Sequence, residues 1–209
     1  MGKSLKDKNR YRLALVVLAN IAAYMAMLNN KGFGIEPWIE TLTNIQKLVP
    51  GLLVSVLTSV INAQIDHVNK ARLVFWKWRH PLPGSRAFTE CASMDLRIDM
   101  DALLNYQDPL PTDPEKQNAL WFKWYRGLQN EPGIEQAHRE YLFTRDYTSI
   151  SFLLIVGLGS LGLWEIEDIQ IASIYLFSLV AQYFLARRAA RNHGVRFVGS
   201  VLAYKASSE

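Results

Sequence analysis

The chain has 209 residues, of which 50% are hydrophobic and 20% charged, and its formal net charge is +4. A single cysteine excludes an intramolecular disulfide and a thiol cluster for a metal ion. These averages would suit a soluble enzyme, but the charged and the apolar residues are segregated along the chain, which indicates a membrane protein.

Four apolar stretches contain no Asp, Glu, Lys, Arg or His. In chain order they are Leu13–Leu28, Leu48–Ala63, Ser149–Trp164 and Ile171–Ala186. With flanking residues whose side chains can reach the interface, each approaches the roughly 20 residues that a bilayer core requires. The sequence therefore predicts an all-α membrane protein with four transmembrane helices, and it leaves no room for a grafted full-size catalytic domain.

The distribution of Lys and Arg predicts the orientation of these helices. The loop between the first two stretches has only two basic residues, Lys31 and Lys47, and the turn between the last two has none. The other 21 basic residues lie in the N-terminal segment, the long central loop and the C-terminal tail. By the positive-inside rule, both termini and the central loop of this multi-pass protein face the cytoplasm.

The ends of the central loop continue the membrane helices in sequence. From Ile61 through Trp78 no proline or glycine interrupts the helical pattern, and Pro81, Pro83 and Gly84 then end it, which predicts a long helix from Leu48 to Arg79. A second helix without proline is predicted from Ile134 to Trp164. Extensions of transmembrane helices 2 and 3, together with the loop between them, would thus form a cytoplasmic helical layer.

Two shorter helices are predicted inside this layer. Asp113 followed by proline and glutamate is typical of a helix start and predicts a helix over Pro114–Arg126. A turn of helix is expected around Met100–Tyr106. The side chains expected to pack inward from the first of these helices are Leu120, Trp121, Trp124 and Leu128. The chain divides into residues 1–64 (N-terminal segment and helices 1 and 2), 65–147 (cytoplasmic helical region), 148–186 (helices 3 and 4) and 187–209 (basic cytoplasmic tail).

Polar and small residues inside the stretches suggest contacts within the membrane. Ser55, Ser59 and Asn62 share one face of the second helix, which could line a pore or hydrogen-bond to neighbouring helices. Gly159 and Gly162 present a small-residue face of the kind that drives helix association in lipid. We therefore expect a homo-oligomer in the bilayer.

Two segments, Phe75–His80 and Trp121–Arg126, interleave aromatic and basic residues. Such segments could stack on nucleic-acid bases and neutralise phosphates. The structural interpretation is preferred, because the first fits an aromatic and cationic membrane belt and the second the buried face of a small helix. The residues expected to dock a partner or nucleic acid are Arg79, Arg86, Trp121, Lys123 and Arg126.

One motif in the tail could be chemical. Arg188 and His193 have the spacing of the R-x4-H element of HEPN ribonucleases, so they are an alternative nuclease pair. An arginine cluster directly after a final span is also what membrane orientation requires. No phosphate-binding loop, dinucleotide fingerprint, nucleophile elbow or paired metal-ligand spacing occurs. The sequence therefore predicts no enzyme, no cofactor and no metal site.

The segments Arg79–Phe88 and Arg191–Ala203 resemble small multi-spanning membrane proteins of bacterial antiviral operons, some of which stand beside RNA-targeting CRISPR effectors. The resemblance implies oligomeric assembly and membrane perturbation or sensing, in partnership with a soluble protein. We therefore expect a defence-associated pore-forming effector or membrane sensor coupled to a cytoplasmic partner. The alternatives are a membrane-tethered HEPN-like ribonuclease and a pure membrane anchor.

Overall fold

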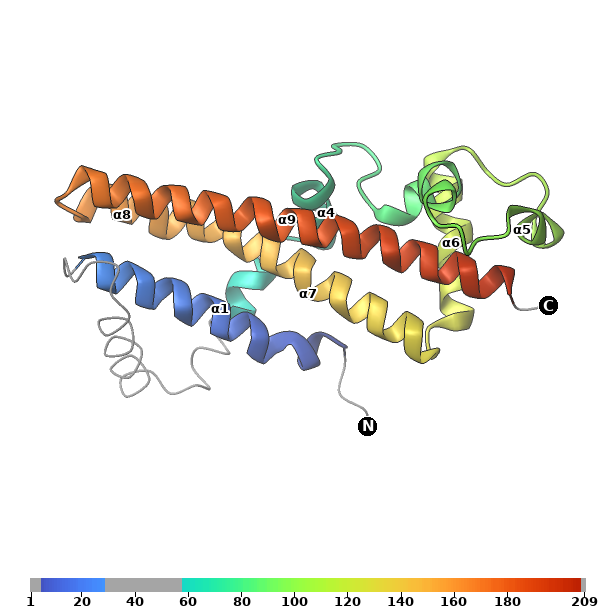
Figure 1. The fold of residues 1–209 in the computed structure, drawn as a ribbon, viewed down its shortest axis with the longest axis horizontal. Helices are drawn as coiled ribbons and strands as arrows, with labels where there is room; N and C mark the ends of the chain where they lie inside the picture. The colour runs from blue at the N-terminus through green and yellow to red at the C-terminus, as the bar shows by residue number, and fades with distance from the viewer. Residues whose placement is uncertain (1–4, 29–57, 208–209) are drawn as a thin grey trace. The chain divides into compact units, whose positions relative to one another are not determined.

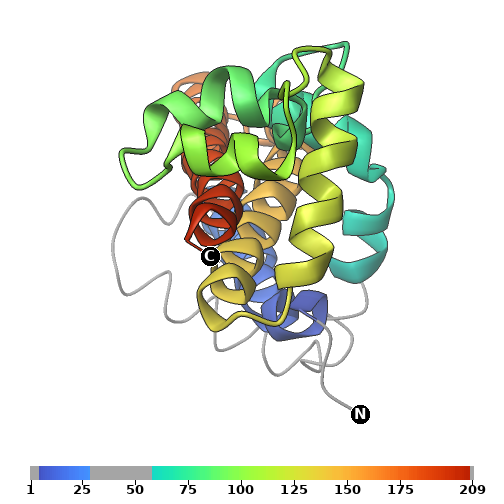
Figure 2. The same ribbon diagram turned by 90° about the vertical axis from the view of Figure 1, so that its right-hand side faces the viewer.

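The computed structural model describes residues 5–28 and 58–207, whose regular secondary structure is entirely helical. The chain forms two compact units, one made of Met1–Asp66 and Asp146–Arg187, the other of His67–Arg145 and Arg188–Glu209. The two long helices, α7 (Pro132–Leu154) and α9 (Ile169–Ala206), each contribute residues to both units (Figures 1 and 2). The all-α fold class is confirmed for the described residues.

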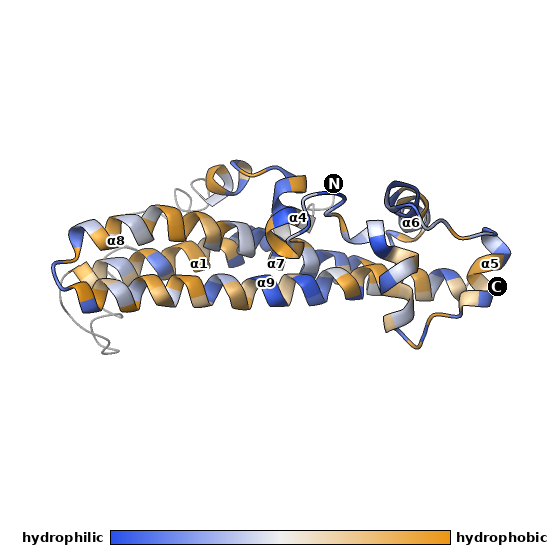
Figure 3. Cartoon of the chain, turned by 90° about the horizontal axis from the view of Figure 1, so that it is seen from above, coloured by the Kyte–Doolittle hydropathy of each residue, from blue (hydrophilic) through white to orange (hydrophobic). Residues whose placement is uncertain are grey.

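The first unit contains the apolar helices. Among the described residues, three helical stretches are long and apolar enough to cross a membrane, namely Asn9–Leu28, Pro132–Glu165 and Ile169–Ala206. They correspond to the first, third and fourth predicted spans, and Figure 3 shows mainly hydrophobic colouring along α8 (Ser160–Glu165). Most of the second predicted span, Leu48–Ala63, lies outside the described residues. The part of it that is described, residues 58–63, is helical.

Glycines allow close helix packing within the first unit. A Cβ atom on Gly159 would lie 2.9 Å from Leu176 Cδ1, and one on Gly162 would lie 3.0 Å from Tyr175 Cδ1. Gly159 ends η4 (Ile155–Gly159), a single π-helical turn between α7 and α8. The small-residue face thus packs against α9 of the same chain, and association between chains stays a prediction.

The predicted helix from Leu48 to Arg79 is wrong in its second half. The helix ends at residue 63, and a separate helix, α4 (His67–Phe75), follows a turn. The Gln64 side chain donates to the Val60 carbonyl at 3.0 Å, while the Gln64 N–H turns to the Ile61 carbonyl at 3.2 Å. The Gln64 side chain therefore occupies the Val60 carbonyl, which the Gln64 N–H would bind if the helix continued. The helix ends here without a proline or a glycine.

The prediction of a proline-free helix before the third span is confirmed. α7, η4 and α8 follow one another from Pro132 to Glu165 with helical backbone throughout. Three residues separate the end of α8 from the start of α9. At the start of α9, the Asp168 carboxylate accepts from the Gln170 N–H at 2.8 Å. This side chain caps the helix start and closes the turn between the last two apolar helices.

The second unit is built from short helices against parts of α7 and α9. Two predicted helices are confirmed: α5 (Met100–Tyr106), capped by Asp99, and α6 (Pro114–Leu128), whose Asp113 cap accepts from two backbone N–H groups. Trp121 and Trp124 are buried as expected, and Leu120 and Leu128 pack partly buried against the same core. The remaining short elements are η1 (Pro83–Arg86), η2 (Ala87–Cys91) and η3 (Ala92–Met94).

The end of α9 supplies much of this core. Phe197 is 3% exposed, and its ring stacks on His138 at 4.6 Å and meets Trp121 edge-on at 5.2 Å between centroids. Val198, Val201 and Leu202 have no exposed surface. The segment expected as a basic tail is therefore helical as far as Ala206, with an apolar face that completes the second unit.

One buried amide fixes α6 to η2. Gln117 is 1% exposed; its Oε1 accepts from the Phe88 N–H at 3.0 Å, and its Nε2 donates to the Thr112 carbonyl at 2.8 Å. Both ends of the amide are satisfied, as a buried polar group requires. Gly84 of η1 lies against α6 so closely that an added Cβ would be 2.6 Å from Trp121 Cε3.

Replacing Gly84 by alanine should therefore destabilise the second unit. Gly84→Ala forces the Trp121 ring or the η1 backbone to move, at a cost of about 1–3 kcal/mol. Gly127→Ala is the matched control, because an added Cβ there meets nothing within 4 Å and alanine is the better helix former by roughly 0.5–1 kcal/mol. Thermal unfolding of the purified chain should show a lower midpoint for Gly84→Ala and no decrease for Gly127→Ala; equal midpoints would contradict the packing.

Candidate functional site

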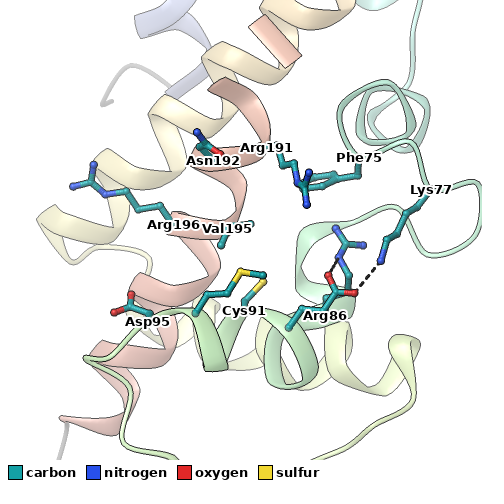
Figure 4. A pocket seen from close by; sticks show the side chains of 11 residues that line it. Phe75, Lys77, Arg86, Cys91, Asp95, Arg191, Asn192, Val195 and Arg196 are labelled. Atoms are coloured by element: carbon teal, nitrogen blue, oxygen red, sulfur yellow. Dashed lines mark hydrogen bonds and ion pairs between the residues drawn. The ribbon is translucent and has the colours of Figure 1, made fainter. Parts of the chain in front are cut away.

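A cavity of about 450 Å³ lies in the second unit between α9, the end of α4 and the short helices η1–η3 (Figure 4). Its volume is within the range of small-molecule sites. The lining residues are Phe75, Lys77, Arg86, Glu90, Cys91, Met94, Asp95, Arg191, Asn192, Val195 and Arg196. Four of these side chains are cationic and two are carboxylates, so the wall carries excess positive charge.

Both carboxylates of the wall are neutralised by basic neighbours. Glu90 pairs with Lys77 Nζ at 2.9 Å and Arg86 Nε at 3.2 Å, which Figure 4 draws as dashed lines. Asp95 pairs with Arg97 Nη2 at 2.6 Å, and the hydrogen bonds from Arg97 lower the pKa of this carboxyl below its usual value. Neither carboxylate therefore neutralises the positive charge of Arg191 and Arg196 on α9.

The α9 side of the cavity carries arginines without acidic partners. Arg191, Asn192, Val195 and Arg196 of α9 line the cavity. Arg191 and Arg196 are about 140° apart around the helix axis, and Figure 4 shows their side chains pointing in different directions. Arg191 and Arg196 are exposed, and neither has an ion-pair partner among the described residues. Their guanidinium groups and the Asn192 amide are available to an anion from solvent.

Arg86, one of the predicted docking residues, lies in this wall but is buried. It is 8% exposed, and its guanidinium carbon lies 4.7 Å from the centroid of the Phe75 ring. A planar guanidinium stacked on an aromatic ring and paired with Glu90 is held in a fixed position. Arg86 therefore shapes the cavity, and the exposed arginines of α9 are the groups that a ligand can reach first.

Cys91 lies at the base of the cavity. Burial raises the pKa of its thiol to about 11, although Arg86 and Lys77 act in the opposite direction. The thiol is protonated at neutral pH, so it is not a nucleophile there. The buried thiol of Cys91 therefore has a packing role.

The other predicted docking residues do not gather at one place. Arg79, Lys123 and Arg126 are exposed, the last two on α6 outside the cavity. Trp121 is 5% exposed and belongs to the core, so its ring offers no surface to a partner. Sequence reasoning missed Arg191 and Arg196 as site residues because it assigned the basic residues of the tail to membrane orientation.

The proposed pore face is only partly visible. Ser55 lies outside the described residues, and Ser59 is half-buried. Asn62 Nδ2 donates to Asp146 Oδ2 at 3.0 Å, and Asp146 is 4% exposed. This contact, within the first unit, favours the hydrogen-bonding interpretation over a pore lining. Asp146 was missed because it lies just before the third apolar stretch.

The nuclease pair is not assembled into one site. Arg188 and His193 lie on the continuous helix α9, where five residues correspond to about 140° around the axis. Arg188 is exposed, whereas His193 lines a smaller cavity of about 200 Å³ with Glu140, Arg196 and Ser200. Among the described residues, no group of three or more His, Cys, Asp and Glu side chains could hold a metal ion.

The buried state of Cys91 predicts slow alkylation. At pH 8, raising the thiol pKa from 9.0 to about 11 lowers the thiolate fraction about a hundredfold, and the reaction with iodoacetamide should accelerate only as the pH approaches 11. Cys91→Ala combined with Ser93→Cys is the control, because Ser93 is exposed on neighbouring η3. Mass spectrometry should show rapid labelling of the control alone; equal rates would contradict the burial of Cys91.

Comparison with known proteins adds no relative to this description. The chain matches no protein-family model, no curated protein and no solved structure.

Proposed function

We propose that the chain is a membrane sensor of the bacterial inner membrane, whose second unit binds a small phosphate-bearing ligand in the basic cavity. The observation that carries this proposal is that two exposed arginines, Arg191 and Arg196, line the cavity with no carboxylate partner among the described residues. The apolar helices of the first unit support the membrane location.

The chemistry of the cavity suits an anion such as phosphate and not a cation. Guanidinium groups bind phosphate through paired N–H donors, and Asn192 adds an amide beside them. Phe75, Met94 and Val195 provide apolar surface for the remainder of a ligand. A volume of about 450 Å³ suits a ligand of nucleotide size.

The helix that carries these arginines supports a sensing role. α9 runs from Ile169 to Ala206, so the ligand-facing residues belong to the same helix as an apolar membrane stretch. In this proposal, a ligand that binds one packing arrangement of the second unit better than another shifts the population between them. Because α7 and α9 have residues in both units, the change in packing of the second unit also changes the packing of the first.

The other hypotheses have less support. The contact between Asn62 and Asp146 uses one polar residue of the suggested pore face within the same chain. For the nuclease, His193 lines the smaller cavity and Arg188 does not. A pure anchor would need no basic cavity. Oligomeric assembly, a soluble cytoplasmic partner and an antiviral setting stay predictions from the sequence and the resemblance.

The cavity predicts binding of phosphate-bearing probes by the full chain in nanodiscs. Wild-type protein should bind ATP and inorganic pyrophosphate in calorimetric titrations. Arg191→Gln combined with Arg196→Gln should weaken binding at least about a hundredfold, because hydrogen bonds to charged groups contribute about 1.5–3 kcal/mol each.

Lys123→Gln combined with Arg126→Gln is the matched control. It removes the same charge from exposed positions on α6 outside the cavity, so its affinity should stay within about twofold of wild type. Absence of binding by wild type, or equal losses in both double variants, would contradict a specific anion site.

A further inference from the structure

The segment Trp76–His80 between α4 and η1, here called the tryptophan loop, exposes two indole rings. Trp76 is 57% exposed and Trp78 is 81% exposed. The core of the same unit buries Trp121 and Trp124 almost completely. Two large aromatic side chains left in solvent within three residues are typical of an interaction surface, since their burial would otherwise stabilise the fold.

The loop is held in this shape by the protein itself. Trp76 and His80 have φ angles of 53° and 47°, in the left-handed region that residues other than glycine rarely adopt. Arg72 Nε donates to the Trp78 carbonyl at 3.2 Å, and its guanidinium carbon lies 6.0 Å from the Trp78 ring centroid. At the far end, Pro81 is buried. The exposed rings are therefore presented by a defined backbone.

The charges of the loop indicate an anionic surface. Lys77 and Arg79 alternate with the tryptophans, and the loop contains no acidic residue. Lys77 already pairs with Glu90, whereas Arg79 is exposed with no ion-pair partner among the described residues. Indole rings beside cationic side chains are the combination found at the interface of an anionic membrane. Nucleic acid would require more free cations along its backbone.

The membrane of the first unit is within reach of the loop. Asp66 ends the first unit, and α4 adds nine residues, about 13 Å of helix. Trp78 follows three residues later, so it lies within roughly 25 Å of Asp66 for any orientation of the two units. The tether is shorter than the thickness of a bilayer.

We propose that the tryptophan loop inserts Trp76 and Trp78 into the interfacial region of the anionic bilayer that holds the first unit, with Arg79 on the lipid headgroups. This contact uses Trp76, Trp78 and Arg79, none of which lines the basic cavity, and it goes beyond the ligand binding proposed above. It fixes one face of the second unit on the membrane.

The test places a nitroxide on the loop of the full chain. Trp78→Cys is labelled in a Cys91→Ala background and reconstituted in nanodiscs of phosphatidylcholine, with and without phosphatidylglycerol. Collision rates with oxygen, which concentrates in lipid, are compared with those of a water-soluble nickel chelate. Phe122→Cys in the same background is the control, since Phe122 is an exposed aromatic residue on α6 of the same unit.

At position 78 we expect oxygen collisions to exceed nickel collisions several-fold in nanodiscs with phosphatidylglycerol, and less in phosphatidylcholine alone. Adding Trp76→Ser should reverse this ratio, while position 122 stays water-like throughout. A water-like probe at position 78 in both lipids would overturn the proposal. So would protection of that probe by a single-stranded oligonucleotide and not by lipid, which would assign the loop to nucleic acid.

Discussion

The second unit depends on the packing of the last turns of α9 into its aromatic core. Phe197 contacts His138 from α7 and Trp121 from α6, so one ring joins three helices that are distant in sequence. Val198, Val201 and Leu202 extend the contact and are fully buried. Arg191, Asn192 and Arg196, earlier in the same helix, line the cavity. The core packing and the charge of the candidate site are therefore properties of one helix.

The same arrangement explains why the cavity remains basic. Glu90 and Asp95 are both engaged by side chains of the short helices and the segments around them. Glu90 or Asp95 could pair with Arg191 or Arg196 only by breaking an ion pair that it already forms. Arg191 and Arg196 are exposed, and an anion that binds exposed guanidinium groups loses less hydration than one that binds a buried site.

The features that could be predicted from the sequence are those with strong local signals. Charge-free apolar stretches identified the three candidate spans among the described residues, and Asp113 followed by proline predicted α6 correctly. The break after residue 63 could not be read in the same way, because it depends on a glutamine side chain that caps a carbonyl, not on a helix-breaking residue. The cavity was missed because it joins residues from Phe75 to Arg196, and its arginines have an equally good explanation as membrane-orienting charges.

The order of the elements along the chain has a consequence for synthesis. The residues that close the aromatic core, Phe197 to Leu202, follow the apolar stretch Ile171–Ala186 within the same helix, and the other apolar helices come earlier still. Domains generally fold as units while the chain grows from its N-terminus. The core of the second unit can therefore close only after these apolar helices have been synthesised.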